Sequence, residues 1–593
     1  MANITLLETG QLLLKCPYPD RYRAKEYGGK WSSKHKGWVW PGRSHHLQNI
    51  IAAFPNALVH KDIYGALQVM NDREGVAYAA KREGWENAIP IEPIPLADGV
   101  TPFQHQVLGY NIGLQLPHHA LLMEMGTGKT LTELMIAARR WQRGEITRML
   151  VVAPATVLPV WPSDAELVGI PVATLQLTGG AARCEKRLSQ FTPLPVACPE
   201  CNGDRVYVSD EGCEISCHRC EQTGRVEPLQ IVCINYEKTW RMIDALKNWK
   251  PDLIVCDESQ RIKTPGAAQS RAMHSLSKIA KYRSILTGTP VPNRPLEFFS
   301  QYKFLDDTIF GTNHTAFKSR YAIMNANGMG FADYLRLDEL TRLAHSVAYR
   351  VTKEEALDLP EQLDTEVTLE LEKNARVVYD KLEKQSFAEL SSLASEGTIS
   401  TPHVLTSMLR LSQITGGFVG DDSGIVHPVS TMKLKALSDI AVDLFDSGKK
   451  LVVFARFRAE ISAIVEKLQP LCGEVLEIHG GIPIPDRGGI VNRFQDESGP
   501  QAIVVQTRAG GLGITLTAAD TAVFYSLDYS FENYDQARAR IHRIGQRNHC
   551  TYIHLMAENT IDQKVLKALK EKRDLAAVVV DGWRDLFKNM ENT

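Results

Sequence analysis

The sequence LLMEMGTGKT, residues 121–130, joins an apolar run to a glycine-rich turn, and the helix-forming residues 131–138 follow it. Glycines at such a turn let backbone N–H groups converge on phosphate oxygens, and the positive end of the helix favours the same negative charge. Lys129 is expected to reach the terminal phosphates of a nucleotide, and the Thr130 hydroxyl to meet Mg²⁺. Met123 replaces the usual first glycine, so a turn without a ligand remains the alternative. The expected phosphate-binding residues are Gly126, Thr127, Gly128, Lys129 and Thr130.

A second polar cluster follows the apolar residues 253–256. Asp257 and Glu258 come directly after that run, where a buried strand would end. Asp257 is expected to hold Mg²⁺, and Glu258 to orient and deprotonate an attacking water. Taken singly, two acids after a strand are usually a helix cap and a solvated neighbour. Their place after the phosphate loop, in the chain order of an ATPase site, favours the catalytic interpretation.

Short apolar runs followed by polar or glycine-rich turns recur along the chain. Such runs are typical of strands buried on both faces of a parallel sheet, with helices between them. Two sets, at about residues 100–305 and 445–560, flank a Leu-, Glu-, Lys- and Ala-rich helical stretch, which predicts two α/β lobes. We place the boundaries at 1–60 for a small N-terminal α+β module, 61–95 for a linker, 96–345 for the first lobe with an insertion at 192–228, 346–430 for the helical region, 431–575 for the second lobe and 576–593 for a tail.

Composition and charge narrow the class of protein. The 593 residues are 44% hydrophobic and 23% charged, as in a globular chain. Lys plus Arg number 67 against 69 for Asp plus Glu, so the whole chain has no nucleic-acid-binding signature. The start lacks the pattern of a signal peptide, and the longest nearly apolar run, 149–161, is too short for a bilayer. We expect no membrane partner and an intracellular location, cytoplasmic or nucleoid-associated, in a bacterium or a phage-infected cell.

Five of the eleven cysteines cluster within residues 198–220. Four of them form two Cys-x-x-Cys pairs separated by 15 residues. Thiolates at this spacing can close a tetrahedral structural zinc site in a reducing compartment, and reduced buried thiols are the alternative. The expected zinc ligands are Cys198, Cys201, Cys217 and Cys220, with Cys213 and His218 as further candidates.

The first 60 residues have a local charge pattern of their own. Residues 20–43 carry seven Lys or Arg against two acids, together with three tryptophans. Basic side chains interleaved with aromatic ones can clamp phosphates and stack on exposed bases. Lys30, Trp31 and Trp38 are therefore expected to bind DNA. The alternative is that Trp31, Trp38 and Trp40 are the core of a small domain.

Six further stretches accompany the phosphate loop in a fixed order. They are residues 151–161 (VVAPATVLPVW), 257–263 (DESQRIK), 286–293 (LTGTPVPN), 349–353 (YRVTK), 507–517 (TRAGGLGITLT) and 536–546 (QARARIHRIGQ). In these motifs the chain resembles superfamily-two helicase-like ATPases, and more narrowly the Swi/Snf family of double-stranded DNA translocases. The resemblance covers about residues 100–570. It implies two RecA-like lobes, with ATP, Mg²⁺ and duplex DNA as ligands.

The resemblance also assigns roles to individual residues. Arg540 and Arg543 would stabilise transition-state charge, and Gln536 would face the γ-phosphate beside them. Gln106 is similar to the adenine-reading glutamine ahead of the phosphate loop, with Gln104 as its rival. Further positions carried over are Gly513 as cofactor-binding, Thr156, Thr507, Gly510 and Gly511 as DNA-contacting, and Thr287, Gly288 and Thr289 as backbone-contacting or coupling residues.

Two positions depart from the family pattern. Gln260 stands where most relatives have His, and we expect it to link the γ-phosphate to DNA sensing. Phe531 stands where the family usually has Trp. Residues 536–548 hold four arginines and no acid, and a solvated basic helix face is the alternative interpretation of that stretch.

Residues 16–20, 28–31 and 37–41 resemble the HARP module of annealing helicases, the Swi/Snf subgroup that rewinds DNA. We therefore expect an ATP-dependent translocase that remodels, rewinds or branch-migrates DNA at replication or recombination forks. The alternatives are a strand-separating DNA or RNA helicase and a nucleic-acid-binding scaffold without turnover. Expected partners are double-stranded, forked or branched DNA and, among proteins, a single-strand-binding protein or a replisome component.

Overall fold

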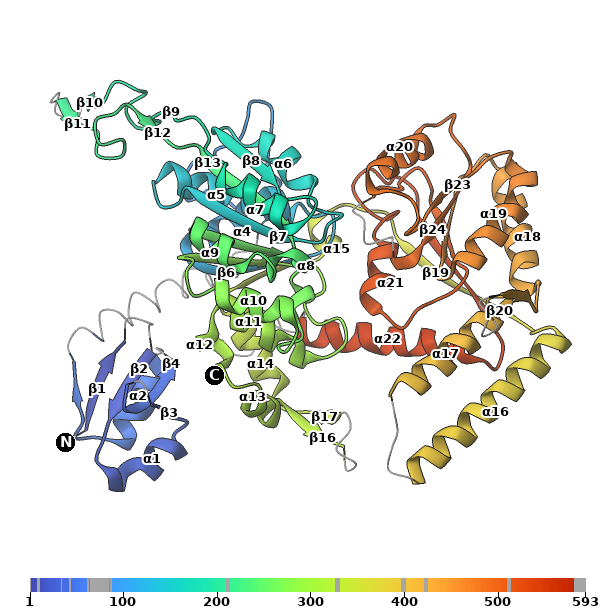
Figure 1. Ribbon diagram of the computed structural model, residues 1–593, viewed down its shortest axis with the longest axis horizontal. Helices are drawn as coiled ribbons and strands as arrows, with labels where there is room; N and C mark the ends of the chain where they lie inside the picture. The colour runs from blue at the N-terminus through green and yellow to red at the C-terminus, as the bar shows by residue number, and fades with distance from the viewer. Residues whose placement is uncertain are drawn as a thin grey trace. The chain divides into compact units, whose positions relative to one another are not determined.

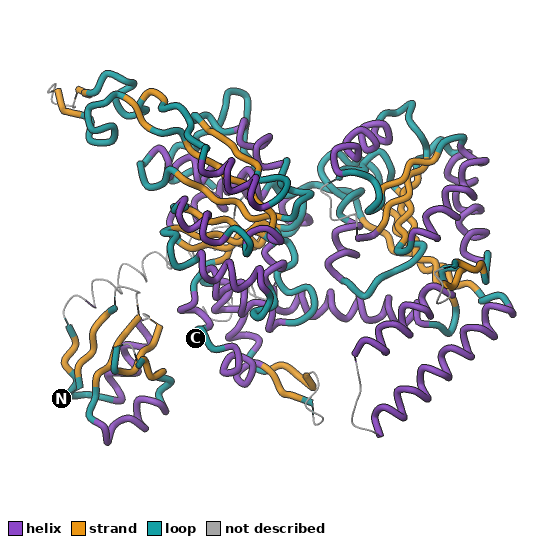
Figure 2. Tube along the Cα trace, in the orientation of Figure 1, coloured by secondary structure: helices purple, strands orange, loops and turns teal. Residues whose placement is uncertain are grey.

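The chain divides into two compact units, one of residues 1–352 with 576–593 and one of residues 353–575 (Figure 1; Figure 2). No helix among the described residues combines the length and the apolar character needed to cross a bilayer. The computed structural model describes residues 2–7, 11–33, 35–41, 44–60, 63, 85, 88–208, 214–325, 331–395, 401–420, 425–508 and 514–580.

The N-terminal module is a five-stranded sheet with the order β3-β4-β2-β1-β5. Neighbouring strands are antiparallel except β1 and β5, which run parallel. Ile4, Leu12, Leu14, Trp40 and Ile50 are buried together, so strand and helix residues share one small core. The elements are β1 (Asn3–Leu6), β2 (Gln11–Lys15), α1 (Arg21–Glu26), β3 (Lys30–Ser32), β4 (Gly37–Pro41), α2 (Ser44–Ala53) and β5 (Leu58–Val59).

The first unit is built on a seven-stranded sheet with the order β18-β6-β15-β14-β7-β13-β8. All neighbours in it run parallel, which confirms the α/β expectation. Strand β14 is buried along its whole length, as a continuous apolar run predicts. The strands are β6 (His118–Met123), β7 (Arg148–Ala153), β8 (Val172–Gln176), β13 (Leu229–Asn235), β14 (Leu253–Asp257), β15 (Tyr282–Leu286) and β18 (Ala348–Val351).

Helices alternate with the strands of this sheet, as parallel pairing requires. The order of the sheet places β15 between β6 and β14, so the carboxyl ends of these three strands meet at one edge. The helices are α4 (Gln104–Gln115), α5 (Lys129–Gln142), α6 (Val160–Asp164), α7 (Ala181–Ser189), α8 (Tyr236–Thr239), α9 (Ile243–Trp249), α10 (Ala268–Leu276), α11 (Phe298–Leu305), α12 (Asp307–Phe310), α13 (His314–Tyr321) and α14 (Leu337–His345), and β16 (Ala322–Met324) with β17 (Phe331–Tyr334) forms a hairpin.

The cysteine-rich insertion lies between α7 and β13. It contains two short antiparallel pairs, β9 with β12 and β10 with β11. These pairs bury few side chains apart from the cysteines, so the insertion has almost no apolar core of its own among its described residues. Its strands are β9 (Val196–Ala197), β10 (Val206–Val208), β11 (Glu214–Ser216) and β12 (Arg225–Val226).

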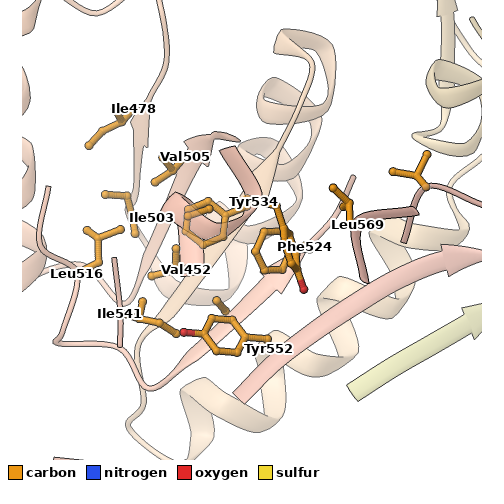
Figure 3. Packing of buried hydrophobic residues seen from close by; sticks show 14 of the residues in the cluster. Val452, Ile478, Ile503, Val505, Leu516, Phe524, Tyr534, Ile541, Tyr552 and Leu569 are labelled. Atoms are coloured by element: carbon orange, nitrogen blue, oxygen red, sulfur yellow. The ribbon is translucent and has the colours of Figure 1, made fainter. Parts of the chain in front are cut away.

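The second unit is a six-stranded parallel sheet with the order β19-β26-β25-β22-β24-β23. Figure 3 shows part of its core, where Val452, Ile503 and Phe524 pack with Tyr552. Its elements are α15 (Lys353–Ala356), β19 (Gln362–Leu369), α16 (Lys373–Ser395), α17 (Thr401–Thr415), β20 (Phe418–Gly420), β21 (Val426–Pro428), α18 (Met432–Asp446), β22 (Leu451–Ala455), α19 (Arg458–Cys472), β23 (Val475–Ile478), α20 (Ile484–Gln495), β24 (Ala502–Gln506), β25 (Thr521–Phe524), α21 (Phe531–Arg538), β26 (Cys550–Ala557) and α22 (Ile561–Val580).

The predicted helical region, 346–430, differs from what the structure contains. Helices α16 and α17 lie side by side within it, but β18 and β19 also fall there (Figure 1). Strand β18 pairs with β6 in the first sheet, and β19 pairs with β26 in the second, so the first part of the region is divided between the two sheets. Edge strands of this kind are recognised by their pairing partners, which a local sequence pattern does not reveal. Similarly, α22 extends to Val580 into the predicted tail.

Candidate active site

The glycine-rich turn after β6 has the backbone that a phosphate loop needs. Gly126 and Gly128 adopt positive φ angles of 86° and 82°, a region that side-chain-bearing residues rarely occupy. Helix α5 begins directly afterwards at Lys129, with Gly128 as its N-cap. The first N–H groups of α5 therefore have no partner within the helix and can bind an anion.

Lys129 is buried in this loop and folded back onto it. Its Nζ donates to the carbonyl oxygens of Met123, at 2.9 Å, and Glu124, at 3.2 Å. Burial lowers the pKa of Lys129, while the nearby carboxylates of Glu258 and Asp257 oppose that shift. The ammonium is thus held between the loop and the acidic pair, where a phosphate would offer it stronger acceptors than carbonyl oxygens.

Asp257 ends strand β14, and both of its carboxylate oxygens accept hydrogen bonds. Trp161 Nε1 donates to Oδ2 at 3.0 Å, and the Glu258 backbone N–H donates to Oδ1 at 3.0 Å. Tyr236, which belongs to no recognised motif, donates its hydroxyl hydrogen to the Asp257 carbonyl oxygen at 2.8 Å. Burial, helped by the adjacent Glu258 carboxylate, raises the pKa of Asp257 to about 7. A bound cation would relieve this cost, and the Thr130 hydroxyl with the Asp257 carboxylate is an oxygen set that suits Mg²⁺.

Glu258 is connected to the next strand through Gln260. The Gln260 amide donates to Glu258 Oε2 at 2.8 Å, and its oxygen accepts from the Thr287 hydroxyl at 2.7 Å. The Thr289 N–H in turn donates to the Thr287 hydroxyl at 3.0 Å. Glu258 itself has a positive φ of 52°, a conformation that costs energy for a non-glycine residue and is found mainly at functional sites. Gln260 thus joins the acidic motif to the motif after β15.

The structure distinguishes between the two candidate glutamines ahead of the loop. Gln106 is buried, and its amide donates to the Gly128 carbonyl oxygen at 3.3 Å. Gln104 is exposed. His105, which local sequence did not mark as part of the site, lies within hydrogen-bond distance of the Thr127 carbonyl oxygen, at 2.8 Å. Gln106 is therefore the glutamine beside the phosphate loop, and its adenine-reading role stays a prediction.

In the second unit, the basic segment is not a helix face. Helix α21 ends at Arg538, and the chain then turns. Gln536 and Arg540 are buried, whereas Arg543 is half-buried and donates weakly to the Ile514 carbonyl oxygen at 3.5 Å. Burial lowers the pKa of Arg543. The solvated-face alternative is therefore wrong for most of this stretch.

Two residues of the same segment have structural partners. Arg538 pairs with Asp364 of β19, with its Nη2 donating to Oδ2 at 3.0 Å. Gln546 donates to the carbonyl oxygens of Thr517, Ala519 and Ile541 and so fixes the turn. The four arginines therefore do not form one equivalent set.

The remaining motif residues of both units are placed as follows. Phe531 is buried in the second core at the start of α21, where its ring contributes to packing. The Thr507 hydroxyl donates to the Ala455 carbonyl oxygen at 3.2 Å, and Thr156 is half-buried in the loop after β7. Gly510, Gly511 and Gly513 lie outside the described residues.

The four expected cysteine ligands come together in the insertion. All four are buried, and their Sγ atoms lie within 4.8 Å of one another. Cys198 Sγ is 3.7 Å from Cys217 Sγ, and Cys201 Sγ is 3.7 Å from Cys220 Sγ. A tetrahedral zinc ion with Zn–S bonds of about 2.3 Å requires sulfur separations of about 3.8 Å, so the donor set fits zinc. Among the described residues, His218 is exposed and outside the cluster, and Cys213 lies outside the described residues.

The three tryptophans of the N-terminal module have different environments. Trp40 is 2% exposed and donates its ring N–H to the Tyr27 carbonyl oxygen at 2.9 Å. Trp31 is 58% exposed, and the half-buried Trp38 meets its ring edge-on with centroids 5.7 Å apart. The core interpretation therefore holds for Trp40, and Trp38 packs against the same core, while Trp31 is exposed. Lys30 is an exposed residue, but its Nζ lies against Gly311 of the first lobe, and burial lowers its pKa.

Comparison with protein families identifies two matching domains. The SNF2-related domain matches residues 103–416, and the helicase conserved C-terminal domain matches residues 432–545. These two ranges contain the phosphate loop, the acidic pair and the arginine segment described above.

Several characterised proteins are similar over most of the chain. The DNA repair and recombination protein RAD54-like of Danio rerio is 25% identical over 79% of this chain. This chain covers 64% of that relative, slightly less than two thirds of its length. The DNA annealing helicase and endonuclease ZRANB3 of Bos taurus is 26% identical over 62% of this chain and 34% of its own. The Sulfolobus solfataricus SWI2/SNF2 ATPase core in complex with dsDNA is 22% identical, with a TM-score of 0.37 over 84% of this chain and 96% of that one.

Proposed function

Because the chain belongs to the SNF2-related family, we propose that it is a DNA-dependent ATPase that translocates along double-stranded DNA and remodels, rewinds or branch-migrates it at replication or recombination forks. The observation that carries the proposal is the buried connection from Glu258 through Gln260 to Thr287. Through this connection, the position of the proposed catalytic carboxylate depends on the motif after β15. A protein that only binds nucleotides would not need such a connection.

The first unit supplies the ATP-binding half of the proposed mechanism. The phosphates would lie over the start of α5, with Lys129 moving from its carbonyl partners to the terminal phosphates. Thr130 and Asp257 would hold Mg²⁺, which when bound neutralises phosphate charge. Glu258 would accept a proton from the attacking water, and Gln260 orients its carboxylate for that step. Gln106 would read the adenine from its place against the loop.

The second unit supplies the charge that completes hydrolysis. Arg540 and Arg543 would stabilise the negative charge that develops on the transferred phosphoryl group, with Gln536 beside them. The same architecture without these arginines would bind ATP but turn it over slowly. Hydrolysis would then require groups from both units.

The N-terminal module offers a contact for exposed bases. Arg21 lies over the rings of Tyr18 and Tyr22, at 3.9 and 4.7 Å from their centroids, and both tyrosines are exposed. Exposed aromatic rings with a basic side chain over them can stack single-stranded bases at a fork, and Lys30 and Trp31 would add to this contact. The relatives named for DNA repair, recombination and annealing support DNA as the polymer. Zinc in the insertion would serve folding, not catalysis.

The test is steady-state ATP hydrolysis by the full chain with no nucleic acid, single-stranded DNA, blunt duplex, forked DNA or structured RNA. We expect duplex or forked DNA to raise kcat by about tenfold or more. Glu258→Gln should abolish the stimulated rate, because an amide cannot accept the proton from water. Stimulation by RNA alone would favour a strand-separating helicase, and no turnover under any condition would favour a scaffold.

A matched control separates loss of chemistry from loss of fold. Glu460 is another fully buried carboxylate, in the second unit, where it caps α19. Glu460→Gln keeps its acceptor oxygen and should leave kcat near wild type. If Glu258→Gln and Glu460→Gln behave alike, the assignment of Glu258 is wrong.

A further inference from the structure

The connector between the two sheets, residues 350–360, begins on a residue that holds the phosphate loop. Arg350 is buried in β18, and its Nη1 donates to the carbonyl oxygens of Leu122 and Gly288, each at 3.2 Å. Its Nη2 pairs with Glu124 Oε1 at 3.0 Å. One guanidinium thus binds the strand that enters the phosphate loop and the motif that follows β15.

Backbone packing makes this junction tight. A Cβ atom at Gly288 would lie 3.2 Å from Glu124 Cα and 3.2 Å from the Met125 nitrogen. The Glu124 N–H also donates to the Val351 carbonyl oxygen at 3.1 Å. Because proteins pack as densely as crystals, a shift of β18 would displace the entry to the phosphate loop rather than be absorbed.

The other anchor of the connector, Lys353, lies in the second unit. Lys353 is buried, and its Nζ donates to the His542 carbonyl oxygen at 3.0 Å. The Pro360 carbonyl oxygen lies 2.8 Å from His542 Nε2. A carbonyl only accepts, so Nε2 carries a proton and donates. His542 stands between Arg540 and Arg543, so the connector holds the segment that bears both arginines.

We propose that Arg350 and Lys353, at opposite ends of one short strap (residues 350–353), are positioning residues: Arg350 positions the phosphate-loop motifs of the first unit, and Lys353 positions the arginine-bearing segment of the second. Val351 and Thr352 alone separate them, so the strap spans at most about 11 Å. Neither residue contacts ATP in the mechanism above: Arg350 acts through Glu124 and Gly288, and Lys353 acts through His542. Each anchor therefore fixes one end of the strap to a motif of its own unit. This inference rests on the proposed ATPase function.

A matched control exists for the Lys353 anchor. Lys450 is another buried lysine of the second unit, and its Nζ donates to the carbonyl oxygens of Phe494, at 2.8 Å, and Gly499, at 3.3 Å. Its carbonyl partners belong to no nucleotide-site motif. Lys353→Met and Lys450→Met each delete a buried amine that caps backbone carbonyls, so both carry a similar cost to folding.

The experiment measures kcat and KM for ATP on the full-length variants, with and without duplex DNA, beside their unfolding midpoints. We expect Lys353→Met to lower kcat about tenfold or more, with KM within about threefold of wild type, because ground-state binding lies in the first unit. Lys450→Met should retain kcat. Equal kcat in the two variants would overturn the inference even if wild type is stimulated by DNA. A wild type that turns over ATP without stimulation contradicts only the proposed DNA dependence, since the two variants can still be compared.

Two further variants test the mechanism of the strap. In a protein that already carries Arg540→Ala, adding Lys353→Met should lower kcat by less than about twofold further. A residue that acts through the arginine segment has nothing left to position once Arg540 is gone. A full additional tenfold loss there would contradict the proposal. Arg350→Lys keeps the charge but loses the fork that reaches both carbonyls, so it should lower kcat with KM little changed. An unchanged kcat would remove Arg350 from the strap.

Discussion

The two parallel sheets share an architecture but differ in what lies at their edges. In the first unit, Gln260 joins Glu258 after β14 to Thr287 after β15, and the Thr287 N–H donates to the Leu121 carbonyl oxygen of β6. In the second unit, Arg540 and Arg543 follow a helix and are held mainly through the backbone around them. The scaffold is thus common to both units, and the loops decide which chemical groups each unit presents at the edge of its sheet.

The largest expected effect is a difference in kcat between variants of two arginines of the second unit, Arg540 and Arg538. Arg540→Ala should lower kcat by about 10³- to 10⁵-fold, because an arginine that stabilises transition-state charge is lost while the phosphate loop is intact. Affinity for ATP, measured by titration of a fluorescent nucleotide, should change little. The control is Arg538→Ala, which breaks the pair with Asp364 and should reduce stability more than kcat. Equal losses of kcat in both variants would mean that the segment acts as a whole.

The next effect concerns the connection inside the first unit. Gln260→Ala removes hydrogen bonds to Glu258 and Thr287, and we expect kcat to fall about 10- to 100-fold with the DNA-stimulated rate most affected. Gln260→His restores a side chain that can donate and accept, so stimulation should return. ATP turnover with and without duplex DNA measures both. If Gln260→Ala lowers the two rates equally, Gln260 orients Glu258 but does not sense DNA.

A buried carboxylate of the second unit should make its stability depend on pH. Burial raises the pKa of Glu460 to about 7, against hydrogen bonds from Ser526 and from the Phe457 and Arg456 backbones that lower it. Between the unfolded pKa of about 4.3 and about 7, the folded state binds more protons, so the free energy of unfolding falls as pH rises. Over this pH interval, Glu460 should lower the free energy of unfolding by as much as about 3 kcal/mol, and Glu460→Gln should remove this contribution.

Denaturant unfolding of wild type and Glu460→Gln between pH 5 and pH 8 measures this pH dependence of the free energy of unfolding. The difference between the two proteins isolates Glu460 from the other titrating groups. Parallel curves across this range would mean that Glu460 stays ionised in the folded state.

The smallest expected effect on turnover comes from the cysteine insertion. Treatment with a chelator, or Cys217→Ser with Cys220→Ser, should expose residues 192–228 to proteolysis, because a zinc ion held by the four cysteines would replace an apolar core there. ATP turnover should change less than about twofold, since no catalytic residue lies in the insertion. Zinc content by metal analysis and limited proteolysis measure the first effect. A large loss of kcat would make the insertion part of the motor.

Several features could be predicted from local sequence alone. The phosphate loop, the acidic pair and the two Cys-x-x-Cys pairs are encoded within a few residues each, since their function depends on short backbone geometry. Continuous apolar runs such as 253–256 predicted buried parallel strands correctly. The pairing of the edge strands could not be predicted from a local pattern. The sequence placed β18 and β19 in a helical region, because an edge strand is defined by a partner strand far away in the chain.

The sequence by itself determined which chemical groups this protein has, in what order, and that two α/β lobes carry them. Only the tertiary structure decided how similar residues differ in their surroundings: Gln106, and not Gln104, is buried beside the phosphate loop, and Arg540 is buried whereas Arg538 pairs with Asp364. It also decided that Trp40 is core while Trp31 is exposed. The reason is that burial and hydrogen-bond partners arise from residues far apart in the chain, such as Trp161 beside Asp257 and Lys353 beside His542. Residue type sets what a side chain can do, and packing sets which of them does it.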